Sequence, residues 1–351
     1  MKKSGLKQIL FILALLLTSL YIFLVFLKSP GINSYERSKF TDMIYGKAWK
    51  PFVYRVFVPV SVRLISGAVP ESFQSQLTEF GNENQQAAKV LSELNWEAEY
   101  LTEYLVACVI MFSALIVFAL FLKKFFKANY DVPEWFTNLL TIGMLFAIPV
   151  FYVNDNYIYD FPSLMFFTAG LFFLQKQNWK LFLSIFFLSC WNKETTVLLT
   201  LIFIIHYRKN FITEKKKYFT LLLLQLVIFI FIKVILTITF LDNPGSFVEF
   251  HLLDYNKILL NGYNLLTFSS LLFLLLLVAY KWKEKPVFLK DSLWIGIPLF
   301  LLTLFFGFFN ELRDYYETYP VMVLLIGYSI AKIFGLDISV KSVGRLEKGR
   351  I

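Results

Sequence analysis

The sequence predicts an all-α membrane protein, a polytopic bundle of about ten transmembrane helices that forms a single membrane domain over residues 1–351. Three observations lead to this fold class. First, 58% of the residues are hydrophobic, 17% are charged and the mean hydropathy is +0.62, whereas about 25% of the residues of a soluble chain are charged. Second, apolar runs of roughly membrane-spanning length recur along the chain. Third, lysines and arginines gather at the ends of these runs, as in membrane proteins.

The spanning helices are predicted from apolar runs bounded by polar residues. The first has the basic start of a signal peptide, but its apolar run from Ile9 to Leu27 is too long and no A-x-A-like cleavage site follows, so we expect a retained helix. The fourth to sixth are shorter than the roughly 20 residues that cross a bilayer, so we expect them to extend into their polar flanks or to include a re-entrant pair. The expected spans are 7–27, 101–122, 135–153, 161–175, 179–191, 195–207, 219–241, 264–281, 293–309 and 318–335.

The basic residues predict the orientation. The short inner connectors and the predicted cytoplasmic tail 336–351 are rich in lysine and arginine, whereas the short outer connectors contain Lys193, Lys257 and Arg313. The positive-inside rule therefore predicts that both termini lie in the cytoplasm. We expect the protein in the inner (cytoplasmic) membrane of the cell. Because the net charge of +9 arises at the ends of apolar segments, we expect a bilayer and no nucleic acid as partner.

The first outer segment, residues 28–100, is too long to be a simple connector. Its middle part, Pro51–Ile65, is apolar with isolated arginines, a pattern typical of one or two helices lying in the membrane interface. The later part, Glu83–Glu99, is polar and rich in helix-forming residues, so we expect a solvated helix that leads into the second span.

The polar clusters between the spans share the outer side: Asn154–Asp160, Trp191–Glu194, Asn310–Glu317 and the long first segment. A polar site built at one membrane boundary is typical of an enzyme or a lipid-handling protein more than of a channel, whose charges would line the whole path.

The arrangement resembles the GT-C superfamily of integral membrane glycosyltransferases, which use sugars linked to polyprenyl phosphate. The resemblance rests on the inner N-terminus, the long first outer loop and the segments KFTDMIY (39–45), YRVFVP (54–59), YDFPSLMFFTAGLFFL (159–174), NKETTVLL (192–199) and ELRDYYETYP (311–320). It implies transfer of a sugar from a polyprenyl-phosphate donor to a glycan, lipid or protein acceptor at the outer face. It also implies a catalytic acid early in the first outer loop, which here is Asp42.

Such a transfer needs a carboxylate that takes the proton of the acceptor hydroxyl and cations that stabilise the departing phosphate. No Gly-rich phosphate loop is needed, because the donor is not a nucleotide. Asp42 is the candidate general base, although an acid there also suits a solvated loop or a helix cap. Arg55, Lys193 and Arg313 are the candidate phosphate ligands. Their alternatives are an interfacial anchor for Arg55, neutralisation of Lys193 by Glu194, and a salt-bridge network for Arg313. In that network the i, i+4 spacing puts Arg313 within pairing distance of Glu317, and the i, i+3 spacing puts Asp314 on the same helical face as Glu317.

Four acids are candidates for binding the sugar hydroxyls: Asp155, Asp160, Glu194 and Glu311. Asp160 is equally suited to capping the helix that follows it. Asp155 and Asp160 could also hold a divalent cation together with water and phosphate oxygens, although two acids do not specify a metal. No transition-metal site is predicted, because neither histidine has a second nitrogen or sulfur ligand nearby in the sequence.

Two other functions stay open at this point. A transporter or flippase of lipid-linked sugars needs polar residues in mid-membrane, and Lys233 is the charge deepest within a predicted span. A non-catalytic membrane protein of envelope polysaccharide assembly predicts that the outer charges do not converge in space. The enzyme predicts that they face one outer cavity.

Overall fold

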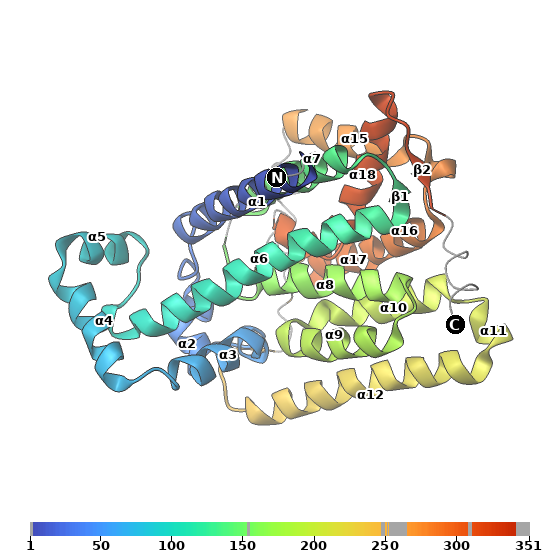
Figure 1. Ribbon diagram of the computed structural model, residues 1–351. Helices are drawn as coiled ribbons and strands as arrows, with labels where there is room; N and C mark the ends of the chain where they lie inside the picture. The colour runs from blue at the N-terminus through green and yellow to red at the C-terminus, as the bar shows by residue number, and fades with distance from the viewer. Residues whose placement is uncertain are drawn as a thin grey trace.

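The computed structural model describes residues 3–152, 155–246, 250, 252, 265–307 and 311–341. The protein is a nearly all-α bundle, as predicted (Figure 1). Within the described ranges the exceptions are two short strands, β1 (Tyr130–Asp131) and β2 (Ser339–Val340), which pair antiparallel.

Five helical segments within the described residues are long and apolar enough to cross a membrane, as in a multi-pass membrane protein. Three of them join consecutive helices: the short 3-10 helix η3 leads into α6, α7 continues into η4, and α16 continues through η7 into α17. The five segments comprise α1 (Lys3–Lys28), η3 (Ala98–Tyr100) with α6 (Leu101–Asn129), α7 (Glu134–Leu145) with η4 (Ile148–Phe151), α12 (Lys215–Thr239), and α16 (Val287–Ser292) with η7 (Leu293–Ile295) and α17 (Gly296–Phe306).

The other five predicted spans also coincide with helices, but these are shorter. None reaches the roughly 20 residues that cross a bilayer, so the count of ten spans stays a prediction. The helix α10 follows a short 3-10 helix, η5 (Glu194–Val197), and α11 (Asn210–Thr213) is a single turn before α12. The shorter helices are α8 (Asp160–Gln175), α9 (Trp179–Asn192), α10 (Leu198–His206), α15 (Leu265–Ala279) and α18 (Tyr319–Ile333).

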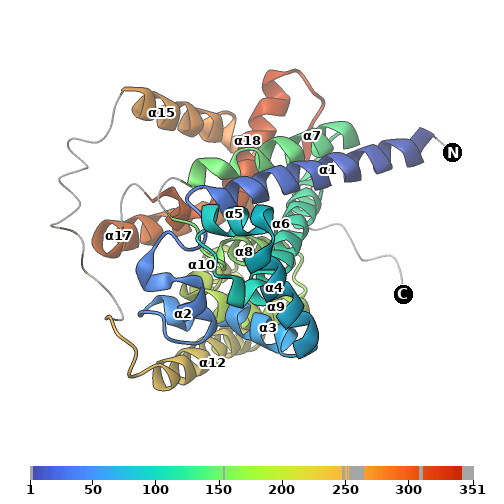
Figure 2. The same ribbon diagram turned by 90° about the vertical axis from the view of Figure 1, so that its left-hand side faces the viewer.

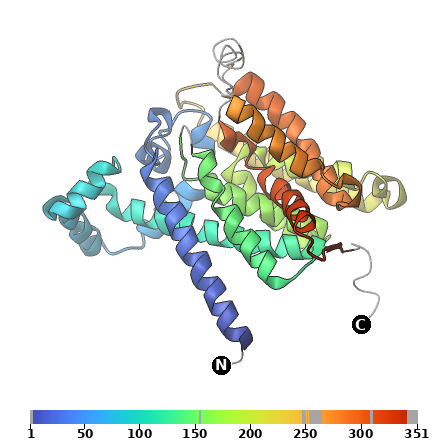
Figure 3. The same cartoon turned by 90° about the horizontal axis from the view of Figure 1, so that it is seen from above.

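The core of the bundle is a row of helices in which α6 packs on α8, α8 on α9 and α9 on α12 (Figure 1). Helices α12 and α15 lie at opposite edges (Figure 2), and α1 runs beside α7 (Figure 3). Gly170 lets α8 approach α10 closely, since a Cβ atom there would lie 2.6 Å from Cδ1 of Leu199. Small residues at such crossings are how membrane helices gain packing contacts.

The long segment 28–100 folds into short helices at one end of the bundle. These include α3, which lies within the segment predicted to hold interfacial helices; it buries Val58 and Val62 and exposes Arg63. The helices are η1 (Glu36–Ser38), α2 (Phe40–Ile44), η2 (Phe52–Tyr54), α3 (Phe57–Ser66), α4 (Glu71–Glu83), α5 (Gln85–Glu93) and η3 (Ala98–Tyr100).

The solvated helix predicted over Glu83–Glu99 is confirmed over Gln85–Glu93, the extent of α5, but its predicted bounds are wrong. Helix α4 ends at Glu83, and the Asn84 side chain starts α5 by accepting hydrogen bonds from the N–H groups of Gln86 and Ala87 at 3.0 and 3.0 Å. Helix α5 ends before Asn95, which has a φ of 54° and turns the chain toward α6. Figure 1 shows α4 and α5 projecting beyond the end of the bundle.

The opposite end of the bundle joins two predicted cytoplasmic segments. Tyr130 pairs with Val340, and the Lys341 ammonium donates to the carbonyl of Lys127 at 3.0 Å. The connector after α6 and the chain before residue 342 therefore share one end, away from α3 and α4 (Figure 1). Residues 342–351 of the predicted tail lie outside the described residues.

Helix α12 turns much of its apolar surface outward. The side chains of Leu223, Phe231 and Ile238 have exposed fractions of 61%, 59% and 70%. Contiguous apolar surface of this kind indicates contact with a lipid bilayer or another protein, and the length and hydropathy of α12 favour the bilayer.

The predicted orientation can be tested with two single cysteines after both native cysteines, Cys108 and Cys190, are replaced by alanine. An impermeant thiol reagent added to intact cells should label Asn82→Cys on α4. It should label Thr213→Cys on α11 only after the membrane is permeabilised, because the positive-inside rule predicts that the basic connectors face the cytoplasm. The reverse pattern of labelling would overturn the outward-facing end.

Candidate functional site

One cavity of about 360 Å³ gathers side chains from six separate parts of the chain: the segments near η1 and η2, residues 155–160, the α9–η5 corner, α12, α17 and η8 (Leu312–Tyr315). Seven of the eight side chains predicted for the site line it. These are Arg55, Asp155, Asp160, Lys193, Glu194, Glu311 and Arg313.

Asp42, the predicted base, does not line this cavity. It lies on the short helix α2, where its backbone carbonyl accepts hydrogen bonds from the N–H groups of Lys47 and Ala48 at 2.7 and 3.0 Å. The structure therefore brings the predicted phosphate and sugar ligands together but does not bring Asp42 among them.

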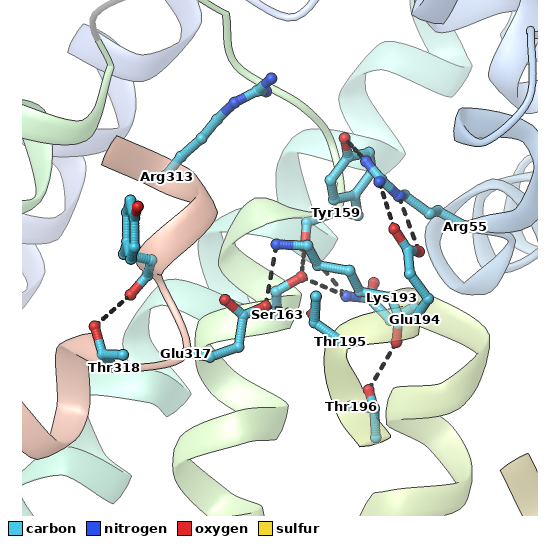
Figure 4. Close-up of polar contacts among 12 residues, drawn as sticks. Arg55, Tyr159, Ser163, Lys193, Glu194, Thr195, Thr196, Arg313, Glu317 and Thr318 are labelled. Carbon is cyan, nitrogen blue, oxygen red and sulfur yellow. Dashed lines mark hydrogen bonds and ion pairs between the residues drawn. The ribbon is translucent and has the colours of Figure 1, made fainter. Parts of the chain in front are cut away.

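Arg55 forms one wall of the cavity rather than an exposed interfacial anchor. Its Nη2 lies 2.7 Å and its Nε 3.4 Å from the two carboxylate oxygens of Glu194, so the guanidinium fork grips both oxygens. Nη1 donates to the Tyr159 hydroxyl (Figure 4). The Arg55 side chain is 11% exposed. Burial disfavours its charge, yet the neighbouring Glu194 carboxylate holds the pKa of Arg55 above its ordinary value.

Lys193 and Glu194 do not neutralise each other, although they are adjacent. Helix α9 ends at Asn192, and Lys193 is extended, with φ −156° and ψ 142°. Successive side chains in extended backbone point in opposite directions. The Lys193 ammonium consequently lies 3.0 Å from a carboxylate oxygen of Glu317, and the two side chains are 11% and 3% exposed. Thr195 donates a hydrogen bond to the same carboxylate (Figure 4).

Asn192 fixes this corner to α8. Its side-chain amide donates to the Ser163 hydroxyl at 2.8 Å and to the Tyr159 carbonyl at 3.2 Å. Both amide contacts are buried, so they hold the end of α9 against the start of α8 and place Lys193 and Glu194 at the cavity wall.

Arg313 pairs with Glu311, not with Glu317 as the i, i+4 spacing predicted. Its Nη2 and Nε lie 2.8 and 3.3 Å from one Glu311 oxygen, and its Nη1 lies 3.4 Å from the Asp155 carbonyl. The prediction assumed a continuous helix, whereas residues 312–315 form a short 3-10 helix that changes the side-chain directions.

Two tyrosines that the sequence reasoning did not single out complete the site. The rings of Tyr157 and Tyr159 stack at a centroid distance of 5.1 Å and an interplanar angle of 6°. The Arg313 guanidinium lies 3.8 Å from the Tyr157 ring centroid, and that of Arg55 lies 4.3 Å from the Tyr159 centroid. Such cation–π contacts stabilise a buried guanidinium. The available signal was the Tyr-x-Tyr pair between two predicted site acids, Asp155 and Asp160; a turn at 158–159 brings the two rings together.

The sequence allowed Asp160 to cap the helix that follows it, but in the structure Asp160 does not cap α8. It is the first residue of that helix, and its carboxylate accepts the backbone N–H of Tyr157 at 2.9 Å, which closes the preceding turn. Its exposed fraction is 2%. Asp160 therefore holds the tyrosine-bearing loop in place.

No group of three or more His, Cys, Asp or Glu side chains capable of holding a metal ion occurs within the described ranges. A divalent cation bound jointly by Asp155, Asp160 and substrate oxygens stays a prediction that this observation does not test.

Asp155 and Lys50 line the cavity without an ion pair to any described residue, and so do two further charged side chains that bear on its chemistry. One is Asp314 on η8, which the sequence had placed in a salt-bridge network. The other is Lys233 on α12, whose ammonium lies 5.8 Å from the Phe229 ring centroid. Lys233 also lines a second, apolar hollow of about 280 Å³ on α12, together with Phe229, Ile230, Val234, Thr237 and Ile238.

Comparison of the chain with protein-family models, curated proteins and solved structures gives no match. The residues and geometry of the cavity are therefore what bear on its function.

The buried pair Lys193–Glu317 should be essential to the fold of the site. Glu317→Leu leaves the Lys193 ammonium without its counter-charge, and breaking a buried pair in this way costs about 3 kcal/mol. Adding Lys193→Met should restore most of that loss. The matched control is the exposed pair Lys217–Glu214, 2.8 Å apart, where Glu214→Leu should destabilise the protein much less, because water screens an exposed pair. The measurement is unfolding in detergent, and equal losses at the two pairs would contradict the buried role.

Proposed function

We propose that the protein is a glycosyltransferase that moves a sugar from a polyprenyl-phosphate donor to an acceptor at the extracytoplasmic membrane face. The observation that carries this proposal is the convergence of seven predicted ligands, from segments far apart in the sequence, on one cavity. A protein that only scaffolds an assembly has no need for such convergence.

The composition of the cavity suits a phosphosugar. A volume of about 360 Å³ falls in the usual range of small-molecule sites, roughly 300–1,000 Å³. The carboxylates of Asp155 and Glu311 supply acceptors for sugar hydroxyls. A guanidinium carries five N–H donors, and Glu194 and Tyr159 engage three nitrogens of Arg55 without using all of its hydrogens. Arg55 therefore retains donors for a phosphate.

Lys233 supports a donor that is carried on a lipid. This cation lines both the polar cavity and the apolar hollow on the outward surface of α12. A ligand with an anionic head and a long apolar chain would place its head near the ammonium and its chain along α12, in the bilayer. A free nucleotide sugar has no use for the second hollow.

Lys233 is also the observation that favours the alternative, a transporter or flippase of lipid-linked sugars. Both functions bind the same ligand. They differ in outcome, because the enzyme releases polyprenyl phosphate and joins the sugar to an acceptor, whereas the flippase leaves the donor intact and moves it across the bilayer.

The direct experiment supplies purified protein with radiolabelled polyprenyl-phosphate glucose or mannose and a membrane extract as acceptor source. Arg55→Ala should lower the release of polyprenyl phosphate by about 10²–10³-fold, as the loss of one oxyanion-type donor does. Arg55→Lys should also be impaired, because an ammonium cannot reproduce the fork.

The control is Arg63→Ala, an exposed arginine of α3 that does not line the cavity and should leave turnover near normal. If Arg55→Ala keeps normal turnover, the cavity does not hold the phosphate. If the wild-type protein moves fluorescent lipid-linked sugar across vesicle membranes and releases no polyprenyl phosphate, the flippase replaces the enzyme.

A further inference from the structure

The acids around the cavity differ in what they already hold. Glu194 and Glu311 bind arginines, Glu317 binds Lys193, and Asp160 binds the backbone N–H of Tyr157. A carboxylate held by a cation or a backbone donor is stabilised in its charged form and is a poor proton acceptor. The question is which acid at the cavity is free of such a partner.

The carboxylates of Asp155 and Asp314 are free in this sense. Both residues line the cavity, are half-buried and have no ion-pair partner within the described part of the chain. The two differ in their packing: the Asp314 carboxylate lies against the end of α17, where a Cβ atom at Gly307 would lie 2.7 Å from its Oδ2. The absence of a side chain at position 307 therefore makes room for this carboxylate between η8 and α17.

We propose that Asp314 is the general base of the transfer reaction, the group that takes the proton of the acceptor hydroxyl; this inference rests on the proposed function. The acceptor oxygen forms a bond to the anomeric carbon of the sugar. The bond from that carbon to the phosphate oxygen breaks, and its electron pair leaves with polyprenyl phosphate. The proton of the acceptor hydroxyl passes to a carboxylate oxygen of Asp314.

The surroundings of Asp314 suit this task. Burial, reinforced by the nearby Glu311 carboxylate, raises the pKa of Asp314 to about 6. A base works best when its pKa lies near the working pH, because it is then both ionised and able to accept a proton. The cations Arg313 and Lys193 also line the cavity, close enough to Asp314 to oppose this rise in its pKa.

Asp314 fits better than the two other candidates. Asp42 does not line the cavity. Asp155 does line it, and its backbone carbonyl faces Arg313, but its carboxylate has no packing position like the one that Gly307 gives Asp314. Asp42 is the matched control, since it lies outside the cavity and can be changed to asparagine in the same way.

The test compares Asp314→Asn with Asp42→Asn, a change outside the cavity. Asparagine keeps the size of aspartate but cannot accept a proton at neutral pH. Asp314→Asn should bind radiolabelled polyprenyl-phosphate sugar normally and lose about 10²–10⁴-fold in transfer, while Asp42→Asn keeps more than a tenth of wild-type activity. Binding and thermal unfolding in detergent check that each variant is folded.

The pH profile of the wild-type enzyme is an independent measurement that needs no variant. A base must be ionised to act, so transfer should fall as the pH drops through about 6, where Asp314 becomes protonated. A pH profile that stays flat down to pH 4.5, or more than a tenth of wild-type activity in Asp314→Asn, would overturn the assignment of Asp314 as the base. Neither result would contradict the proposed function. A wild-type protein that cleaves no donor would overturn the proposed function and this inference with it.

Discussion

The site depends on the pairing of buried charges at one end of the bundle. Moving a cation or a carboxylate out of water is unfavourable by several kcal/mol unless an opposite charge and hydrogen bonds compensate. Three pairs meet that requirement: Arg55–Glu194, Lys193–Glu317 and Arg313–Glu311. The first two join segments more than a hundred residues apart in the sequence. They hold the long first segment, the α9–η5 corner and the chain before α18 around one cavity.

This pairing also decides which groups are left for chemistry. The cations that the sequence assigned to phosphate binding already have carboxylate partners, which fix their positions and leave only their remaining N–H groups for a ligand. Asp314 and Lys233 are different, because each reaches the cavity without an ion pair to a described residue. One is an acid at the polar end, and the other is a cation beside the apolar hollow of α12. A head-and-tail ligand that carries a phosphate and a sugar fits that division.

The sequence predicted the helical fold class and the residues that line the cavity. It did not predict which of these charged residues pair with one another. Hydropathy is a local property, so the helices were found where apolar runs occur, although α8, α9 and α10 are too short to establish ten crossings. The meeting of the predicted residues in one cavity was expected from their predicted position on one side of the membrane. Polar clusters that share one membrane boundary have little room to separate. Pairing depends on backbone direction, which hydropathy does not contain. Because the backbone at Lys193 is extended, the side chains of Lys193 and Glu194 point in different directions. The 3-10 helix at 312–315 places Arg313 beside Glu311.

The most direct test of the account is to locate the donor on the protein. A polyprenyl-phosphate sugar with a photoreactive group on its chain, near the phosphate, can be cross-linked to the purified protein, and the labelled peptides can be identified by mass spectrometry. The account predicts labels on α12 around Lys233 and on the facing residues of α17, reduced by excess unlabelled donor. Competable labels confined to the surfaces of α1 and α7 would contradict it.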